Sequence, residues 1–271
     1  MKPDASLLEP IPRSKGRASI GWIEPVPFNG KDCWNAYEFS FLDERGVPEV
    51  AILRIEYSSD SPYLIESKSL KIYLNSYAMC TFKDVHGAIS QIIRDLSAHL
   101  RAEVDINAKD ARRFSNMFTV TDTFSFIDDL ENLEVNSYEY SPELLKATES
   151  KESEYFLYSN LLKSNCPLTG QPDWASIYLY IEPDKYSIDS ASLLNYIVSY
   201  RTHQEFHEEC CERILYDIVE VINPQKIAVL CKYTRRGGID INPLRLFPRD
   251  FTIAQLPDDF KQLIYTRDFR Q

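Results

Sequence analysis

A cysteine in a turn-rich loop is the side chain with the clearest chemical potential. Residues 164–174 read Ser-Asn-Cys-Pro-Leu-Thr-Gly-Gln-Pro-Asp-Trp, so two prolines and a glycine make a rigid loop around Cys166. A thiolate is a strong nucleophile once a neighbouring group lowers its pKa or accepts its proton. Asp173 follows at the mouth of an apolar run and could return to the same pocket as the proton shuttle. The alternative is an inert thiol beside an aspartate that caps a strand.

Two histidines and a glutamate form a second polar group. His203 and His207 are four residues apart and therefore share a helix face, and Glu208 follows directly. With Cys210 or Cys211 nearby, this pattern could hold a metal. The order His-Gln-Glu-Phe-His is not the zinc-protease order His-Glu-x-x-His, because glutamine takes the place of the base. A solvated helix face is the simpler interpretation, and we assign Cys210 to the apolar core.

A third group follows the last apolar strand. Arg235-Arg236-Gly237-Gly238 combines two guanidinium groups with two conformationally permissive glycines, which suits a phosphate. The alternative is an ordinary basic hairpin turn.

The composition excludes several classes of protein. The 271 residues are 44% hydrophobic and 26% charged, which is enough apolar surface for a core and excludes wholesale disorder. The eight glycines form no Rossmann or P-loop motif. A net charge of -11 disfavours the phosphate backbone of nucleic acids as a partner. No apolar run approaches the ~18 residues of a membrane span. Without an export signal, the six scattered cysteines predict free thiols in the cytoplasm.

The chain contains an internal repeat. Residues 63–77 (YLIESKSLKIYLNSY) align with residues 186–200 (YSIDSASLLNYIVSY), and eight of the fifteen positions are identical. Before each copy lies an apolar run rich in β-branched and aromatic residues, at 52–57 and 176–181, which predicts a strand. We therefore expect a protein built by duplication.

A helical pattern follows each copy, and the two patterns align at 92–96 and 214–218. Each half is strand, strand or turn, helix and strand in outline, which predicts an α+β fold. We place one module at residues 1–120 and the other at 151–271, with a polar and acidic connector at 121–150.

The two copies differ at the positions that could do chemistry. The first holds Glu66, Lys68 and Lys71, and the second has Asp189, Ala191 and Leu194 in their places. The second half alone carries the cysteine loop and the His-Glu pair. This complementary split suggests one composite site that draws on both halves. The alternative is that one half is a structural remnant.

The string Glu-Ser-Lys-Ser-Leu-Lys-Ile-Tyr-Leu-Asn-Ser at 66–76 closely resembles the defining motif of the 7-cyano-7-deazaguanine reductases, the QueF family of queuosine biosynthesis. The long form of this family is a tandem of two modules, with the motif in the first and the reactive cysteine in the second. Residues 163–174 resemble its cysteine loop, and 206–208 and 236–243 resemble its later motifs. Residues 7–13 are similar to its N-terminal segment. The resemblance covers most of the chain.

The resemblance implies a fold and a reaction. The fold is the tunnelling fold, in which an antiparallel sheet carries two helices on one face, here as tandem modules. The reaction reduces a nitrile to a primary amine with two NADPH, giving 7-aminomethyl-7-deazaguanine. In the implied roles, the Cys166 thiolate forms a thioimide with the nitrile, Asp173 protonates its nitrogen, and His207 serves in later proton transfers.

The resemblance also implies the binding residues. Those for the substrate are Glu66, Ser67, Lys68, Phe206, His207 and Glu208. A deazaguanine presents N–H donors side by side, and a carboxylate accepts such a pair bidentately. Those for NADPH are Lys68, Ser69, Arg236 and Gly237. No metal, nucleic acid or membrane is expected to bind, and a cytoplasmic homodimer is the expected assembly.

Two other functions stay open on the residues alone. A pterin or purine enzyme on the same fold would need a set of zinc ligands that the sequence does not supply. A base-binding module without nitrile reduction would have no use for Cys166 and Asp173.

Overall fold

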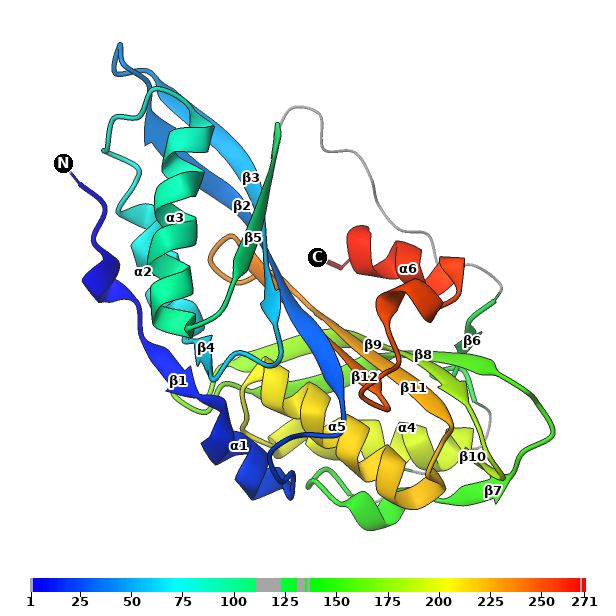
Figure 1. The fold of residues 1–271 in the computed structure, drawn as a ribbon. Coiled ribbons are helices and arrows are strands. Elements are labelled where there is room, and N and C mark those ends of the chain that lie inside the picture. Colours follow the sequence, from blue (N-terminus) through cyan, green and yellow to red (C-terminus); the bar gives the residue numbers. More distant parts are fainter. Residues whose placement is uncertain (1, 111–122, 131–134, 136, 269) are drawn as a thin grey trace. The chain divides into compact units, whose positions relative to one another are not determined.

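The computed structural model describes residues 2–110, 123–130, 135, 137–268 and 270–271 (Figure 1). The chain forms two compact units, and neither is continuous in sequence. Unit 1 contains Met1–Gly16, Lys31–Asn116 and Arg235–Ile241, and unit 2 contains Arg17–Gly30, Met117–Thr234 and Asn242–Gln271. The points at which the chain passes between the units include α1 (Arg13–Ile20), the start of β2 (Asn29–Leu42) and β12 (Ile239–Phe247).

Unit 1 is an antiparallel sheet with two helices on one face. Its strands follow the order β5, β3, β2, which are Val104–Asp110, Pro48–Ser58 and Asn29–Leu42. Alternate residues of β2 and β3 point toward α2 (Ser67–Asn75) and α3 (Val85–Leu100) and share one hydrophobic core with them. The short strands β1 (Pro10–Pro12) and β4 (Tyr63–Ile65) pair beside this layer.

Unit 2 has a larger sheet with helices on both faces. Its strands follow the order β12, β11, β9, β8, β6, which are Ile239–Phe247, Lys226–Tyr233, Pro172–Glu182, Tyr155–Asn165 and Ser125–Phe126. The neighbours are antiparallel except for β6, which is parallel to β8. The helices are α4 (Ser190–Ser199), α5 (His207–Ile222) and α6 (Asp258–Tyr265). A separate pair joins β7 (Ala147–Glu149) to β10 (Tyr186–Ile188).

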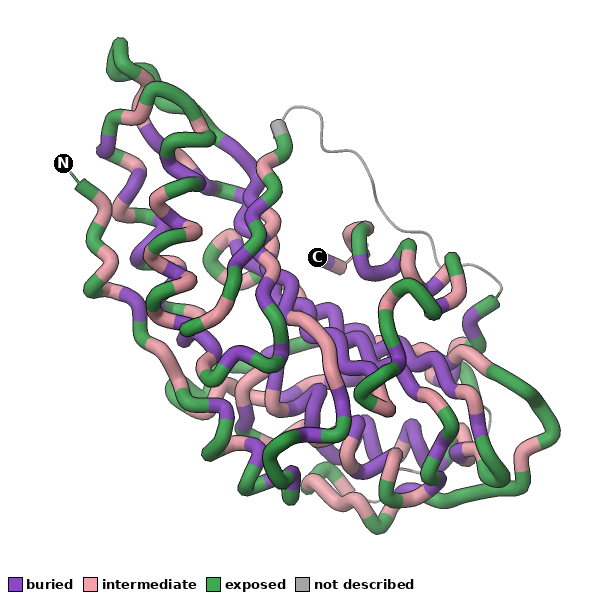
Figure 2. The backbone as a smooth tube through the Cα atoms, viewed as in Figure 1, coloured by how far each residue is buried: buried purple, intermediate pink, exposed green. Residues whose placement is uncertain are grey.

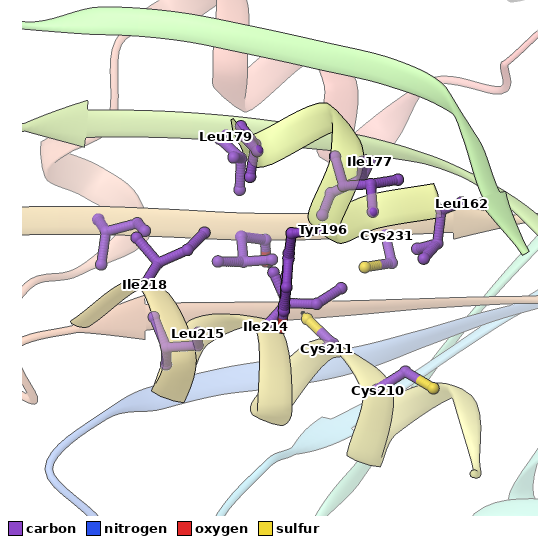
Figure 3. Close-up of a cluster of buried hydrophobic side chains, with 14 of the residues drawn as sticks. Leu162, Ile177, Leu179, Tyr196, Cys210, Cys211, Ile214, Leu215, Ile218 and Cys231 are labelled. Carbon is purple, nitrogen blue, oxygen red and sulfur yellow. Dashed lines mark hydrogen bonds between the residues drawn. The ribbon is translucent and has the colours of Figure 1, made fainter. Parts of the chain in front are cut away.

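Alternation along β9 explains how both faces of this sheet are covered. Ile177 and Leu179 point into the core formed with α4 and α5, whereas Tyr178 and Tyr180 join the core formed with α6. The strand is therefore buried on both sides, as the purple tube in Figure 2 shows. Figure 3 shows the first of these cores, where side chains of α5 meet those of α4 and the strands.

The predicted α+β class is confirmed, and so are several predicted elements. The strands expected at 52–57 and 176–181 lie within β3 and β9. The helix predicted around 214–218 is α5, which ends at Ile222. The next residue, Asn223, takes a left-handed conformation with φ of 41° and is followed by a proline. Cys210 is fully buried, as expected for a core position. The helix on the opposite face of the unit 2 sheet, α6, has no counterpart in the prediction.

The repeated residues build the same structure twice. Glu66 caps α2 by accepting hydrogen bonds from the amides of Lys68 and Ser69, and Asp189 caps α4 through the amide of Ser192. At the C-terminal end of each helix, two tyrosine hydroxyl groups bond to each other, 2.7 Å apart in both cases, and the first of the two also donates to an aspartate of the next helix. These sets are Tyr73, Tyr77 and Asp95 in unit 1, and Tyr196, Tyr200 and Asp217 in unit 2.

The described part of the predicted connector packs on unit 2. Phe124, Ile127 and Leu145 are buried in its cores, while residues 111–122, 131–134 and 136 lie outside the described part. The module boundaries at 1–120 and 151–271 stay a prediction. None of the helices in the described ranges is long and apolar enough to cross a membrane.

Candidate active site

Cys166 starts the loop that joins β8 to β9. The loop closes on itself, because the Cys166 amide donates to Gln171 O and the Gly170 amide donates to Cys166 O, both at 2.9 Å. Gly170 has φ of +67°, a conformation that favours glycine. All six cysteines are in the described part of the chain, and Cys166 is the only one that is not buried. The sequence prediction singled out the same thiol for its loop.

Asp173 and His207 approach each other on the face of the unit 2 sheet that α4 and α5 cover. Asp173 is the second residue of β9 and pairs with Ser164, so it lies at the base of the cysteine loop. Its Oδ1 is 3.4 Å from Nε2 of His207, the first residue of α5. The ring of Tyr233 packs edge-on against the imidazole, with ring centroids 4.1 Å apart. The buried carboxylate and the imidazole therefore lie within ion-pair distance of each other.

The start of α5 carries the other residues predicted to bind substrate in this unit. Phe206 precedes the helix as its N-cap, and the Glu209 side chain accepts a hydrogen bond from its amide at 3.3 Å. Glu208 is 2% exposed, so a solvated helix face is wrong for this residue. A helix N-terminus favours a negative charge, so the start of α5 suits a carboxylate at this position.

A cluster of charged residues that the sequence analysis missed lies around the start of α5. Glu205 accepts hydrogen bonds from the Arg213 guanidinium and from Nε2 of His203. Burial raises the pKa of Glu205, but these hydrogen bonds outweigh it and hold the pKa below its ordinary value. Burial, together with the charge of Glu205, raises the pKa of Glu209 to about 7. Glu205 precedes the helix, so no helical spacing pairs it with Arg213.

The remaining predicted residues are in unit 1. Glu66, Ser67, Lys68 and Ser69 form the N-terminal end of α2. The Glu66 carboxylate is 6% exposed and accepts from the Lys68 amide at 2.9 Å and the Ser69 amide at 2.7 Å. Lys68 is exposed. The sequence analysis predicted Glu66 as a binding residue and did not reveal that Glu66 also caps α2.

The glycine hairpin at 235–238 is also part of unit 1. Gly237 and Gly238 have φ of +58° and +78°, and a Cβ atom on Gly237 would lie 3.1 Å from Cδ of Lys71. The structure therefore brings Lys71 of α2 against the hairpin that carries Arg236. The hairpin is anchored by Asp240, whose carboxylate accepts from Asn35 at 2.7 Å and from the Tyr37 hydroxyl at 2.6 Å.

The two histidines do not converge as metal ligands would. His203 Nε2 contacts Glu205, and His207 Nε2 contacts Asp173. Within the described ranges, no group of three or more histidine, cysteine or acidic side chains is arranged to hold a metal ion.

Comparison with known proteins gives consistent matches along the chain. A family model described as "Nitrile reductase, 7-cyano-7-deazaguanine-reductase N-term" matches residues 2–108, and one described as "QueF-like protein" matches residues 172–247. A relative from Bordetella pertussis is 45% identical over 242 residues, covering 89% of this chain and 88% of its own. One from Burkholderia multivorans is 46% identical over 245 residues, with the same coverage of 89% and 88%. Both are named NADPH-dependent 7-cyano-7-deazaguanine reductase.

Among solved structures, the apo form of the archaeosine synthase QueF-Like is 20% identical with a TM-score of 0.34, covering 36% of this chain and 95% of that one.

Two α+β units with repeated helix caps, one of them carrying a partly exposed cysteine on the loop whose base holds an Asp-His contact, define a class of duplicated α+β protein. Within that class, the chain belongs to the 7-cyano-7-deazaguanine reductase family, QueF.

Proposed function

We propose that this chain reduces the nitrile of 7-cyano-7-deazaguanine to the aminomethyl group of 7-aminomethyl-7-deazaguanine, with NADPH as the reductant. Its relatives carry the name of this activity over most of the chain length. The observation that carries the proposal is Cys166, the one accessible thiol among the six, on a closed loop whose base holds the Asp173–His207 contact. A nitrile carbon accepts hydride poorly, and a thiol adduct turns it into a reducible C=N group.

The Cys166 sulfur forms a bond to the nitrile carbon as one π bond of the nitrile opens. Asp173 donates the proton that the nitrogen then takes, which gives a thioimide. NADPH supplies the two hydrides, one for each reduction. After the first, the carbon is a thiohemiaminal held by Cys166, and its C–S bond breaks with the electron pair returning to sulfur. The imine left behind is reduced to the amine, so two hydrides and two protons are consumed for each nitrile.

His207 keeps Asp173 supplied with protons. Nε2 of His207 and Oδ1 of Asp173 are 3.4 Å apart, and a small movement when substrate binds would bring them to hydrogen-bond distance. The packed ring of Tyr233 limits where the imidazole can turn. We assign His207 the proton donations of the later steps, after sulfur has left.

Carboxylates are proposed to recognise the deazaguanine edge. Glu208 is nearly buried, where a bidentate pair of hydrogen bonds to ring N–H and exocyclic amine is strongest. Phe206 supplies a ring to pack on the base. Glu66, with Ser67 and Lys68, is the proposed contribution from unit 1, because the first copy of the repeat alone has Glu66 and Lys68.

The cofactor contacts are proposed for Lys68, Ser69, Arg236 and Gly237. The left-handed glycines leave the hairpin backbone bare of side chains, and Lys71 packs over it. Guanidinium and ammonium groups beside two glycines fit the phosphates of NADPH.

We also propose that the chain works as a homodimer in the cytoplasm and that its product is used for queuosine in tRNA. The family resemblance supports both. Six free cysteines agree with a reducing compartment. Light scattering during gel filtration checks the assembly, and a particle of 31.5 kDa would contradict the dimer.

The test mixes the purified protein with 7-cyano-7-deazaguanine and follows absorbance and intact mass. We expect a substrate-sized adduct on Cys166 without NADPH, and oxidation of two NADPH per substrate when it is added. Cys166→Ala should bind the base and form no thioimide band. Asp173→Asn should bind and turn over about 10²–10⁴-fold more slowly. A thioimide band in Cys166→Ala, or no NADPH oxidation by the native protein, would refute the proposal.

A further inference from the structure

The residue before the reactive cysteine makes an unusual number of contacts. Asn165 is the last residue of β8 and pairs with Pro172 of β9. Its other edge forms a short parallel bridge with Gln204, in which the Asn165 amide donates to His203 O at 2.8 Å and the Glu205 amide donates to Asn165 O at 3.1 Å. The backbone of Asn165 therefore joins the cysteine loop to the segment that leads into α5.

The side chain of Asn165 strengthens the same joint. Its Nδ2 donates to Arg201 O at 3.2 Å and to His203 O at 3.1 Å. Its Oδ1 accepts from the Lys163 ammonium at 2.6 Å, and that ammonium also donates to Arg201 O at 2.6 Å. An amide has donors at one end and an acceptor at the other, and both ends are used here. A carboxylate of the same shape would turn an acceptor toward two carbonyl oxygens.

The joint continues into α5 through an ion pair. Glu205, two residues before His207, is 7% exposed and accepts from the guanidinium of Arg213, almost two turns into the helix. It also accepts from His203 Nε2 at 3.1 Å. The segment at 201–205 is thus tied to the cysteine loop on one side and to the helix on the other.

We propose that Asn165 is a positioning residue that fixes Cys166 relative to His207 and Glu208, with Lys163 and the Glu205–Arg213 pair as its supports. This inference rests on the proposed function, in which Cys166 is the nucleophile. The thiol and its partners come from different elements, so their alignment depends on what joins those elements. A displacement of about 1 Å between reacting groups costs up to 10²-fold in rate, although no reacting atom is removed.

The test is Asn165→Asp, which keeps the shape and the contact with Lys163 but removes the two N–H donors. Its matched control is Gln204→Glu, which makes the same amide-to-acid change at an exposed side chain of the same segment. We measure the rate and amplitude of thioimide formation at saturating substrate, the KM for NADPH, and the alkylation rate of Cys166 by iodoacetamide. If Asn165→Asp does not fold, Lys163→Met removes the support from the other side and takes its place.

We expect thioimide formation to slow about 10–100-fold in Asn165→Asp, with full amplitude and the alkylation rate and KM for NADPH close to native. Lys163→Met should slow it several-fold, and Gln204→Glu should behave as the native protein. A native rate with an amplitude reduced to the folded fraction would mean a structural role only and overturn the inference. So would an equal loss in alkylation, or an equal slowing in Gln204→Glu. Failure of the native protein to form a thioimide would instead refute the proposed function itself.

Discussion

The Glu66 carboxylate has two tasks at the scale of a single residue. It caps α2 through two backbone amides, and the proposed function asks it to accept hydrogen bonds from the substrate. Two carboxylate oxygens offer about four lone-pair sites, so two amide donors leave capacity for a ligand. In the second copy of the repeat, the equivalent residue Asp189 has a shorter side chain and still caps α4. Capping therefore does not require the length of a glutamate.

Glu66→Asp therefore tests binding without losing the cap. We expect the melting temperature to stay within about 2 °C of native, since an aspartate already caps the equivalent helix. Substrate affinity should fall about tenfold or more, because the carboxylate is withdrawn by one methylene. Calorimetric titration of Cys166→Ala with and without Glu66→Asp measures this under conditions where no adduct forms. Unchanged affinity would leave Glu66 as a cap alone.

Glu209 gives the protein a dependence on pH. Its pKa is raised to about 7 from 4.5, chiefly by burial and then by Glu205. Below pH 4.5 the carboxyl is protonated in both states, and between 4.5 and 7 only the unfolded chain releases the proton. The stabilisation present at low pH is therefore lost as the pH rises through this range, and the cost stays constant above it.

Glu209→Gln should remove this slope and raise the free energy of unfolding above pH 7 by about 3 kcal/mol relative to native, while its amide oxygen can still accept from the Phe206 amide. Urea unfolding at pH 5, 6, 7 and 8 measures it. Glu220→Gln removes a carboxylate from the exposed face of the same helix and serves as the control. If the free energies of unfolding of Glu209→Gln and of the native protein differed by the same amount at every pH, Glu209 would not be the source of the pH dependence.

At the scale of elements, the repeated tyrosines and aspartates fasten α2 to α3 in unit 1 and α4 to α5 in unit 2. In unit 2, Asp217 accepts from Tyr196 and, at 2.8 Å, from Tyr140. Tyr196 is fully buried, and burial raises its pKa and that of Asp217. In unit 1, Asp95 is half-buried and also accepts from Gln91 at 2.8 Å. Tyr73 is as fully buried as Tyr196, so the two clusters differ in the aspartate, which is more exposed in unit 1.

Removing one hydroxyl should therefore cost more in unit 2. We expect Tyr196→Phe to lower the free energy of unfolding by roughly 2–3 kcal/mol and Tyr73→Phe by roughly 1 kcal/mol, because a buried group left without its partner pays its full desolvation. Chemical denaturation of the two matched variants gives both numbers. Equal costs would mean that burial does not distinguish the clusters.

The sequence predicted helices and strands better than it predicted the hydrogen bonds that connect distant segments. Periodicity located β3, β9 and α5, since the apolar pattern of each is set by its own neighbours along the chain. The cysteine loop was predicted from its prolines and glycine. The bonds of Asn165 to 201–205 were not, because they join residues about 36–40 positions apart and follow no period. Glu66 was predicted to bind the substrate, and its role as the cap of α2 was missed.

At the scale of the whole molecule, each unit contains a segment from elsewhere in the sequence. Unit 1 includes 235–241, whose Ile239 and Ile241 belong to its core and whose Asp240 holds Tyr37. Unit 2 includes 17–30, whose Trp22 and Phe28 belong to its own core. The two halves of the sequence therefore do not coincide with the two folded units.

A fragment of residues 1–120 should consequently fail to fold cooperatively. It lacks two core side chains and a buried acceptor of unit 1, and a small domain has only about 5–15 kcal/mol to lose. Circular dichroism during heating measures this. The control joins 235–241 to the fragment through a flexible linker, which should restore a transition. A sharp transition in the plain fragment would show that the segment is dispensable.

The seven residues at 235–241 also determine the order of events while the chain is being made. Most of unit 1 leaves the ribosome early, but its last piece is translated only after α5 and β11 of unit 2. The first half must wait, with its place for Ile239 and Ile241 unfilled, until the second half has nearly emerged. Both units then reach completion almost together, and a ribosome that stalls before residue 241 leaves behind an unfinished first unit rather than a finished one.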